Sequence, residues 1–120
     1  MKRILVIEDE PDVAKSIKML LEDAGYKADI VLGGKEGLKN MSCYDLILLD
    51  IIMPKMSGRE VLKEMKKRGI DKPVIVVSAV GVPQVVRDEF AILYPGTGFV
   101  SKPHMYDDLV KEIKTALARK

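Results

Sequence analysis

The sequence contains very little cysteine, histidine or bulky aromatic residue. Its 120 residues include one Cys, one His, two Phe and no Trp. A single cysteine excludes a disulfide framework within the chain and a cysteine-based zinc site. Such cysteine usage is typical of a reducing compartment, so we expect a cytoplasmic protein.

Long apolar runs and an excess of one charge are also missing. The run Ile4 to Ile7 is too short for a signal peptide core or a membrane-spanning helix, and acids follow it directly. Twenty basic residues against 18 acidic ones leave a net charge of +2. The basic side chains gather near expected helix ends, as in 63–69 and 116–120, where they suit the helix dipole. We therefore expect neither a membrane nor a nucleic acid as a partner.

Short apolar runs alternate with helical patterns along the whole chain. Five runs rich in β-branched residues are typical of strands buried on both faces, at residues 4–7, 28–32, 46–49, 74–77 and 98–100. Apolar residues at helical spacing predict helices at about 11–24, 35–41, 59–68, 83–93 and 106–119. No repeat or linker interrupts this order, so we expect one domain over residues 1–120.

The alternation predicts a parallel sheet with helices on both faces, a three-layer α/β/α sandwich. Ligands of such sheets bind beyond the carboxyl ends of the strands. Glu8 and Asp9 follow the first run, Asp50 the third, Ser78 the fourth and Lys102 the fifth. After the second run, Gly33-Gly34 predicts a turn.

Three carboxylates at one sheet edge repel one another and need a partner. Mg²⁺ prefers oxygen ligands and is usually held by one or two carboxylates together with phosphate oxygens. The amine of Lys102 then suits a second anion that shares the metal. The pattern favours a site for a divalent cation and an anion that shares it.

Four short motifs stand at these strand ends in order. They are IEDE at 7–10, LLDIIMPKMSG at 48–58, SA at 78–79 and FVSKP at 99–103. With them, the sequence resembles the receiver domain of two-component response regulators over nearly its full length. The resemblance implies the flavodoxin-like strand order 2-1-3-4-5. It also implies a signalling domain that catalyses only its own phosphorylation and slow dephosphorylation.

The resemblance implies a role for each residue at the sheet edge. Asp50 is the expected phospho-acceptor, taking a phosphoryl group from the phosphohistidine of a sensor histidine kinase or phosphotransfer protein. Lys102 and Ser78 are expected to contact that group. The expected Mg²⁺ ligands are Glu8, Asp9, Asp50 and the backbone carbonyl of Ile52.

A conformational switch is implied as well. On phosphorylation Ser78 is expected to move toward the phosphate and Phe99 to turn inward. This reshapes the face of the fourth helix, fifth strand and fifth helix, where a downstream protein would bind. Pro83 and Pro95-Gly96 predict a shortened or displaced fourth helix. Apolar Ile52 and Val80 stand where rapidly dephosphorylated relatives have polar residues, which predicts a long-lived phosphoryl state.

Each residue taken alone also has a structural explanation. Asp50 would serve as a strand-end acid or helix cap, the acids at 8–10 would suit a helix N-terminus, and Phe99 would fill the core. We expect His104 to be an exposed loop residue, since no acid or cysteine lies at metal-ligand spacing.

Rival functions fit less well. The acids after the first strand would repel the phosphate of flavin mononucleotide, and Ile52 stands where an aspartate-dependent phosphatase usually has its second acid. A degenerate receiver that binds proteins without phosphorylation remains the alternative.

Overall fold

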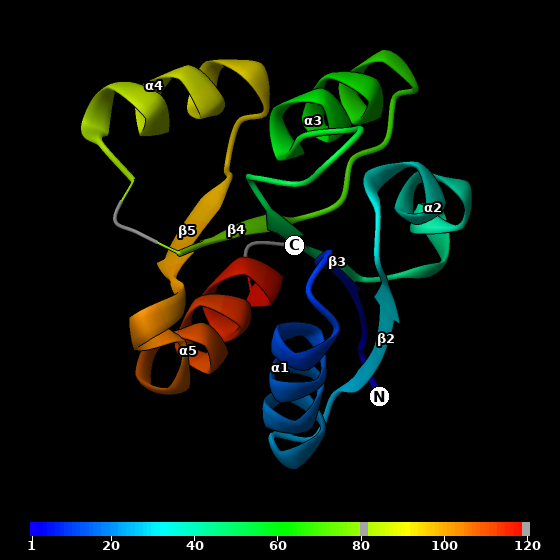
Figure 1. The fold of residues 1–120 in the computed structure, drawn as a ribbon, viewed down its shortest axis with the longest axis vertical. Coiled ribbons are helices and arrows are strands. Elements are labelled where there is room, and N and C mark those ends of the chain that lie inside the picture. Colours follow the sequence, from blue (N-terminus) through cyan, green and yellow to red (C-terminus); the bar gives the residue numbers. More distant parts are fainter. Residues whose placement is uncertain (80–81, 119–120) are drawn as a thin grey trace.

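Each of the five apolar runs forms a strand, and helices alternate with the strands (Figure 1). The computed structural model describes residues 1–79 and 82–118. The strands are β1 (Arg3–Ile7), β2 (Lys27–Val31), β3 (Leu46–Asp50), β4 (Val74–Ser78) and β5 (Gly98–Ser101). The helices are α1 (Pro11–Asp23), α2 (Gly34–Lys39), α3 (Gly58–Lys67), α4 (Gln84–Leu93) and α5 (Met105–Ala118). Among residues 1–79 and 82–118, none of the helices has both the length and the hydrophobicity that a membrane span requires.

The strands form one sheet in the order β2-β1-β3-β4-β5, with every neighbouring pair parallel. This confirms the predicted order 2-1-3-4-5. Because all strands run the same way, their carboxyl ends meet at one edge. The central strands β3 and β4 are buried along their full length, which explains why they appear in the sequence as unbroken apolar runs.

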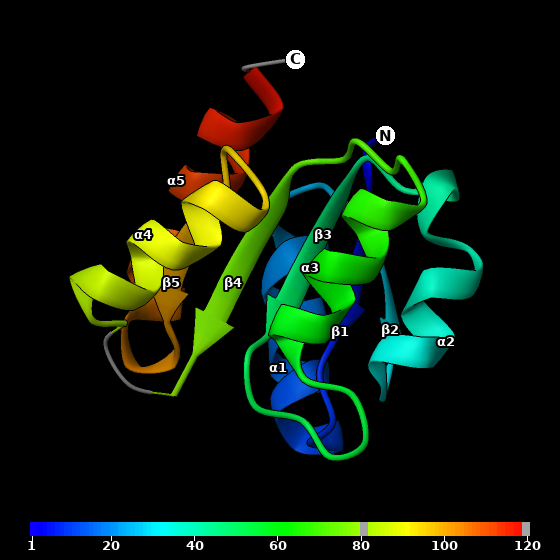
Figure 2. The same ribbon diagram turned by 90° about the horizontal axis from the view of Figure 1, so that it is seen from above.

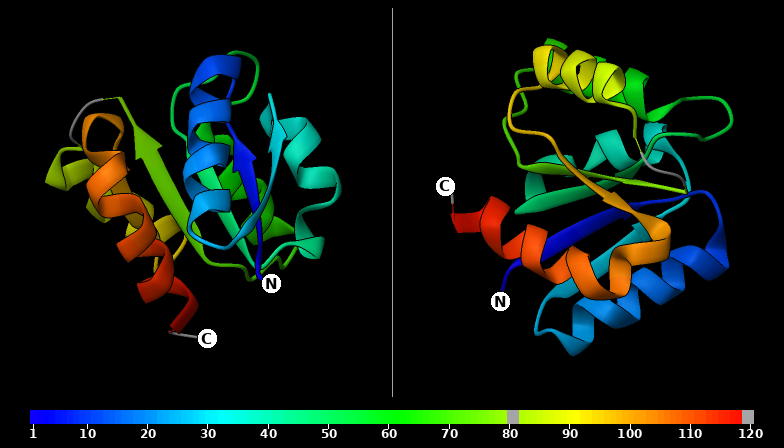
Figure 3. Two further views of the ribbon diagram at one scale, coloured as in Figure 1. Left: turned by 90° about the horizontal axis from the view of Figure 1, so that it is seen from below. Right: turned by 90° about the vertical axis from the view of Figure 1, so that its left-hand side faces the viewer.

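Helices cover both faces of the sheet, as the predicted three-layer sandwich requires. Helices α2, α3 and α4 lie on one face and α1 and α5 on the other (Figures 1 and 3). Successive residues of a strand point to opposite faces. In β1, Leu5 and Ile7 therefore join the cluster under α2, α3 and α4, whereas Ile4 and Val6 join the cluster under α1 and α5.

The ends of the first and third helices follow from local chemistry. Pro11 stands in the first turn of α1, where a proline's missing N–H costs nothing, and Gly25 with φ +94° follows the helix end. Ser57 caps α3: its hydroxyl accepts from the Glu60 N–H (3.3 Å), and the Glu60 carboxylate accepts from the Ser57 N–H (3.1 Å). Helix α3 therefore starts one residue before its predicted start.

The second helix differs from its prediction at both ends. The helix α2 begins at Gly34 and ends at Lys39, and a 3₁₀ turn at Met41–Cys43 follows it. A Cβ on Gly34 would lie 2.5 Å from Cγ2 of Val61, so glycine allows α2 to pack tightly against α3. Only Gly33, which precedes the first helical residue, belongs to the turn predicted there.

Helix α4 (Gln84–Leu93) begins one residue after its predicted start and ends at its predicted end. It lies beside α3, on the face of the sheet formed by β4 and β5 (Figure 2). A short 3₁₀ helix, Lys102–His104, leads from β5 into α5. His104 is exposed, as predicted, but it belongs to this 3₁₀ helix and not to a loop.

Candidate functional site

The polar residues that follow the strands lie together at the carboxyl edge of the sheet. Glu8 comes directly after β1, Asp50 and Ser78 are the last residues of β3 and β4, and Lys102 follows β5. The predicted assembly of these residues at one edge depends on the parallel sheet, which places all four strand ends on the same side. The buried polar residues of the described part of the chain are Glu8 (1% exposed), Asp50 (6%) and Ser78 (6%).

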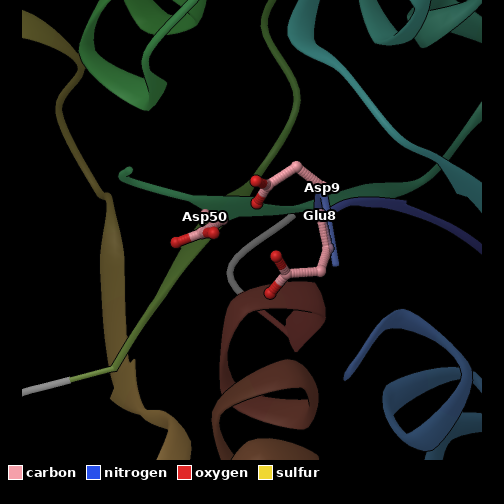
Figure 4. A group of neighbouring side chains, drawn as sticks. All are labelled: Glu8, Asp9 and Asp50. Atoms are coloured by element: carbon pink, nitrogen blue, oxygen red, sulfur yellow. The ribbon is translucent and has the colours of Figure 1, made fainter. Parts of the chain in front are cut away.

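Three carboxylates form the acidic part of the site. One carboxylate oxygen from each of Glu8, Asp9 and Asp50 lies within 4.8 Å of the others. The side chains of Glu8 and Asp9 extend from the end of β1 toward Asp50 at the end of β3 (Figure 4). The Ile52 N–H donates to Oδ1 of Asp50 at 3.4 Å, leaving most of the hydrogen-bonding capacity of that carboxylate unused by the backbone. Hard oxygen donors in this number suit a divalent cation.

A lysine partly balances these acids. Nζ of Lys102 lies 2.6 Å from Oε1 of Glu8 and 3.5 Å from Oδ2 of Asp50. Burial raises the pKa of Glu8 to about 7; the Lys102 ammonium opposes this rise and the neighbouring Asp50 adds to it. Burial lowers the pKa of Lys102, but the hydrogen bond to Glu8 and the charge of Asp50 raise it more. The site therefore favours further positive charge.

The loop after Asp50 packs closely on that residue. The Gly58 N–H donates to the carbonyl of Ile51 at 2.8 Å. A Cβ on Gly58 would lie 2.6 Å from the carbonyl oxygen of Asp50 and 2.9 Å from the Cα of Ile51. Both are backbone atoms that cannot yield easily, so glycine is needed where α3 begins. The start of α3 thus fixes the backbone that carries the Asp50 carboxylate.

The remaining predicted residues lie beside the acids. Ser78 is buried one position beyond Val77, which pairs with Asp50 across β3 and β4. Phe99 is half-buried in β5, with its ring centroid 6.0 Å from that of Phe90. Ile52, two residues after Asp50, is 77% exposed, so its side chain does not fill the core.

The close pairing of Glu8 with Lys102 was not anticipated from the sequence, which suggested only that Lys102 serves an added anion. The signal lies in the side-chain length of Glu8, which is one methylene longer than that of an aspartate. That length lets the carboxylate reach a cation that follows β5, a strand on the far side of β3 and β4 in the sheet order.

Comparison with known proteins agrees with this geometry. Residues 4–114 match the model of the response regulator receiver domain. The transcriptional regulatory protein DltR of Streptococcus agalactiae is 36% identical over 93% of this chain and 50% of its own length. The response regulator SaeR of Staphylococcus aureus is 32% identical over 99% of this chain and 52% of its own length. The chain thus spans about half the length of these relatives.

Solved structures of response regulator proteins are also similar to this chain. The response regulator TrrA of Thermotoga maritima, in complex with Mg²⁺ and BeF, is 35% identical with a TM-score of 0.83, over 97% of this chain and 99% of its own. A CheY-like receiver domain protein of Methanospirillum hungatei is 29% identical with a TM-score of 0.84, over 99% and 95%. The chain therefore belongs to the response regulator receiver domain family of two-component signalling systems.

Proposed function

We propose that residues 1–120 form one receiver domain in which Asp50 accepts a phosphoryl group. The observation that carries this proposal is the placement of Asp50. This residue is 6% exposed, at the end of the central strand β3, with Lys102 Nζ at 3.5 Å and two further carboxylates beside it. Such a carboxylate is oriented and has a cation next to the position that an incoming oxyanion would occupy.

In the proposed step, a carboxylate oxygen of Asp50 attacks the phosphorus of a phosphohistidine on the partner. A phosphorus–oxygen bond forms as the phosphorus–nitrogen bond breaks, and the electron pair of that bond remains on the imidazole nitrogen, which takes up a proton. The product is an aspartyl phosphate. Because phosphoryl transfer depends mainly on alignment and on charge neutralisation, the chain needs few groups of its own.

The donor set fits a resident Mg²⁺ ion. Oxygens within 4.8 Å of one another on Glu8, Asp9 and Asp50 supply hard, anionic ligands, and we assign the backbone carbonyl of Ile52 as a further one. When bound, Mg²⁺ neutralises charge on the oxygens of the transferred group. The Mg²⁺–BeF complex of the related TrrA supports this choice of metal.

Lys102 and Ser78 complete the proposed site. The ammonium of Lys102, held by Glu8 at 2.6 Å, would turn to an oxygen of the incoming phosphoryl group. The buried hydroxyl of Ser78 would donate a hydrogen bond to another oxygen. The domain would thereby catalyse only its own phosphorylation and slow dephosphorylation.

The partners follow from the same chemistry. A sensor histidine kinase or a phosphotransfer protein would supply the phosphohistidine. Ser78 and Phe99 would report the phosphorylated state to the surface formed by α4, β5 and α5, where a downstream protein would bind. The names of the related DltR and SaeR, a transcriptional regulatory protein and a response regulator, support an output of this kind.

Intact-protein mass spectrometry after incubation with acetyl phosphate tests the proposal. We expect one phosphoryl adduct with Mg²⁺ and almost none when a chelator removes it, because the transferred oxygens then lack their counter-charge. Circular dichroism would confirm that the protein stays folded in the chelator. A folded protein that gains no adduct with Mg²⁺ would favour the alternative, a degenerate receiver that binds proteins without phosphorylation.

The exposed Ile52 carries a prediction about the lifetime of the phosphoryl group. An apolar side chain two residues after Asp50 cannot hold the water that attacks the phosphorus, so we expect slow loss of phosphate. Ile52→Asn should speed this loss about ten-fold, the effect of one added hydrogen bond to that water. The mass adduct would be followed over time, with Ile92→Asn on the exposed face of α4 as control. Equal decay of the two variants would contradict the role assigned to Ile52. Val80, the other residue on which the predicted long lifetime depends, lies outside the described residues.

A further inference from the structure

The C-terminal end of α4 is fixed to the entry of β4 by a buried tyrosine. The hydroxyl of Tyr94, which is 8% exposed as a residue, accepts from the Lys72 N–H at 2.9 Å and donates to the Lys72 carbonyl at 2.5 Å. The backbone of Tyr94 accepts in turn from the hydroxyl of Thr97. Because these bonds are partly buried and involve backbone groups, this end of the helix is firmly anchored.

The middle of α4 is held instead by two arginines at the surface, Arg87 of α4 itself and Arg59 of α3. The guanidinium of Arg87 lies 5.1 Å above the Phe99 ring, and its Nε donates to the carbonyl of Val82 at 3.1 Å. From α3, Arg59 pairs with Glu89 at 3.0 Å and lies 5.5 Å from the centre of the Phe90 ring. Exposed ion pairs and cation–π contacts of this kind are weak and easily exchanged for water.

The two rings join these arginines into one contact path. Phe90 is fully buried and its ring centroid lies 6.0 Å from that of Phe99, at an interplanar angle of 41°. Phe99 pairs with Val76 of β4, two residues before the buried Ser78. The path therefore leads from the strand that carries Ser78, through Phe99, to the surface side chain of Arg87.

We propose that Arg87 is a releasable latch on α4 and that Tyr94 is its fixed anchor. The cation–π contact of Arg87 holds Phe99 and the first turns of α4 in the resting arrangement. When this contact breaks, Phe99 and the first half of α4 move together while the end at Tyr94 stays in place. Coupling of this movement to the state of Asp50 rests on the phosphoryl-accepting function proposed above. Arg87 is thus a positioning residue that does not contact the phosphoryl group.

Hydrogen exchange of the unphosphorylated protein tests the latch without any phosphoryl chemistry. Arg87→Met keeps much of the side-chain length but removes the charge and the donor. We expect amide exchange in residues 82–90 to become roughly two- to five-fold faster, because one exposed cation–π contact is lost. Exchange around Tyr94 should not change. Arg68→Met is the matched control, since Arg68 pairs with Glu64 on α3 at 2.9 Å. Unchanged exchange in 82–90 of Arg87→Met would overturn the latch.

Phosphoryl uptake from acetyl phosphate with Mg²⁺ tests the coupling. Weakening the resting arrangement should make uptake by Arg87→Met about two- to five-fold faster than by wild type or Arg68→Met. Arg87→Lys, which keeps a cation near the ring, should restore most of the wild-type rate. Faster exchange with an unchanged uptake rate would overturn the coupling. Absence of uptake in every variant, wild type included, would instead count against the proposed function, while the exchange comparison would still decide the latch.

Discussion

Replacement of Asp50 by asparagine should abolish phosphoryl uptake completely. The introduced amide would have nearly the shape of the carboxylate, so the strand β3 and the loop to Gly58 should keep their positions. The amide lacks the anionic oxygen that attacks phosphorus, and no neighbouring group can replace that oxygen in the same alignment. Intact mass after incubation with acetyl phosphate and Mg²⁺ should show an adduct for the wild type and none for Asp50→Asn.

A second aspartate gives the matched control. Asp107 is exposed in the first turn of α5, so Asp107→Asn makes the same chemical change away from the sheet edge. We expect this variant to take up phosphate as the wild type does. If Asp50→Asn retained the adduct, peptide mapping would locate the true acceptor, and the assignment of Asp50 would be wrong.

Replacement of Lys102 by methionine should affect both stability and phosphoryl transfer. Its ammonium lies 2.6 Å from Glu8 and 3.5 Å from Asp50, so its removal leaves two buried carboxylates without their cation. In metal-free buffer we expect a loss on the order of 3 kcal/mol in the free energy of unfolding. Because the same cation would stabilise the transferred oxygens, the rate of phosphoryl uptake should fall about 100-fold.

These two effects of Lys102→Met need separate readouts. Urea unfolding followed by circular dichroism gives the stability, and the time course of the mass adduct gives the rate. The exposed Lys111 of α5 provides the control, and Lys111→Met should match the wild type in both measurements. A Lys102→Met protein as stable as the wild type would contradict the assignment of a structural ion pair, and an unchanged uptake rate would contradict its role in transfer.

The strands and their order were predictable because the sheet is parallel and covered on both faces. β3 and β4 are buried throughout, so their sequences are unbroken apolar runs that end at Asp50 and Ser78. The family motifs then supplied the strand order, which apolar runs alone do not encode. The second helix was less predictable, since its start at Gly34 depends on the approach of Val61 from α3.

The sequence was enough to predict which residues come together at the candidate site. It was not enough to predict which of their atoms contact one another. Strand ends in a parallel sheet must share an edge, and this brought Glu8, Asp50 and Lys102 together. That Lys102 lies closer to Glu8 than to Asp50 depends on side-chain lengths and on the path from β5 into the following 3₁₀ helix. The contacts of Arg87 and Tyr94 likewise depend on how α4 crosses β5 and the entry of β4, for which the sequence has no local signal.

The order of the strands also has a consequence for synthesis of the chain. Asp50 obtains its ammonium neighbour from Lys102, far downstream in the sequence, and only when β5 has paired with β4. β5 is the last strand of the sheet to be synthesised, so this pairing cannot form until most of residues 1–118 have been made. A ribosome-bound chain that ends before β5 would therefore carry the aspartate but not the assembled site. Under the proposed function, a nascent chain would therefore compete for phosphoryl groups only after β5 has been made and paired.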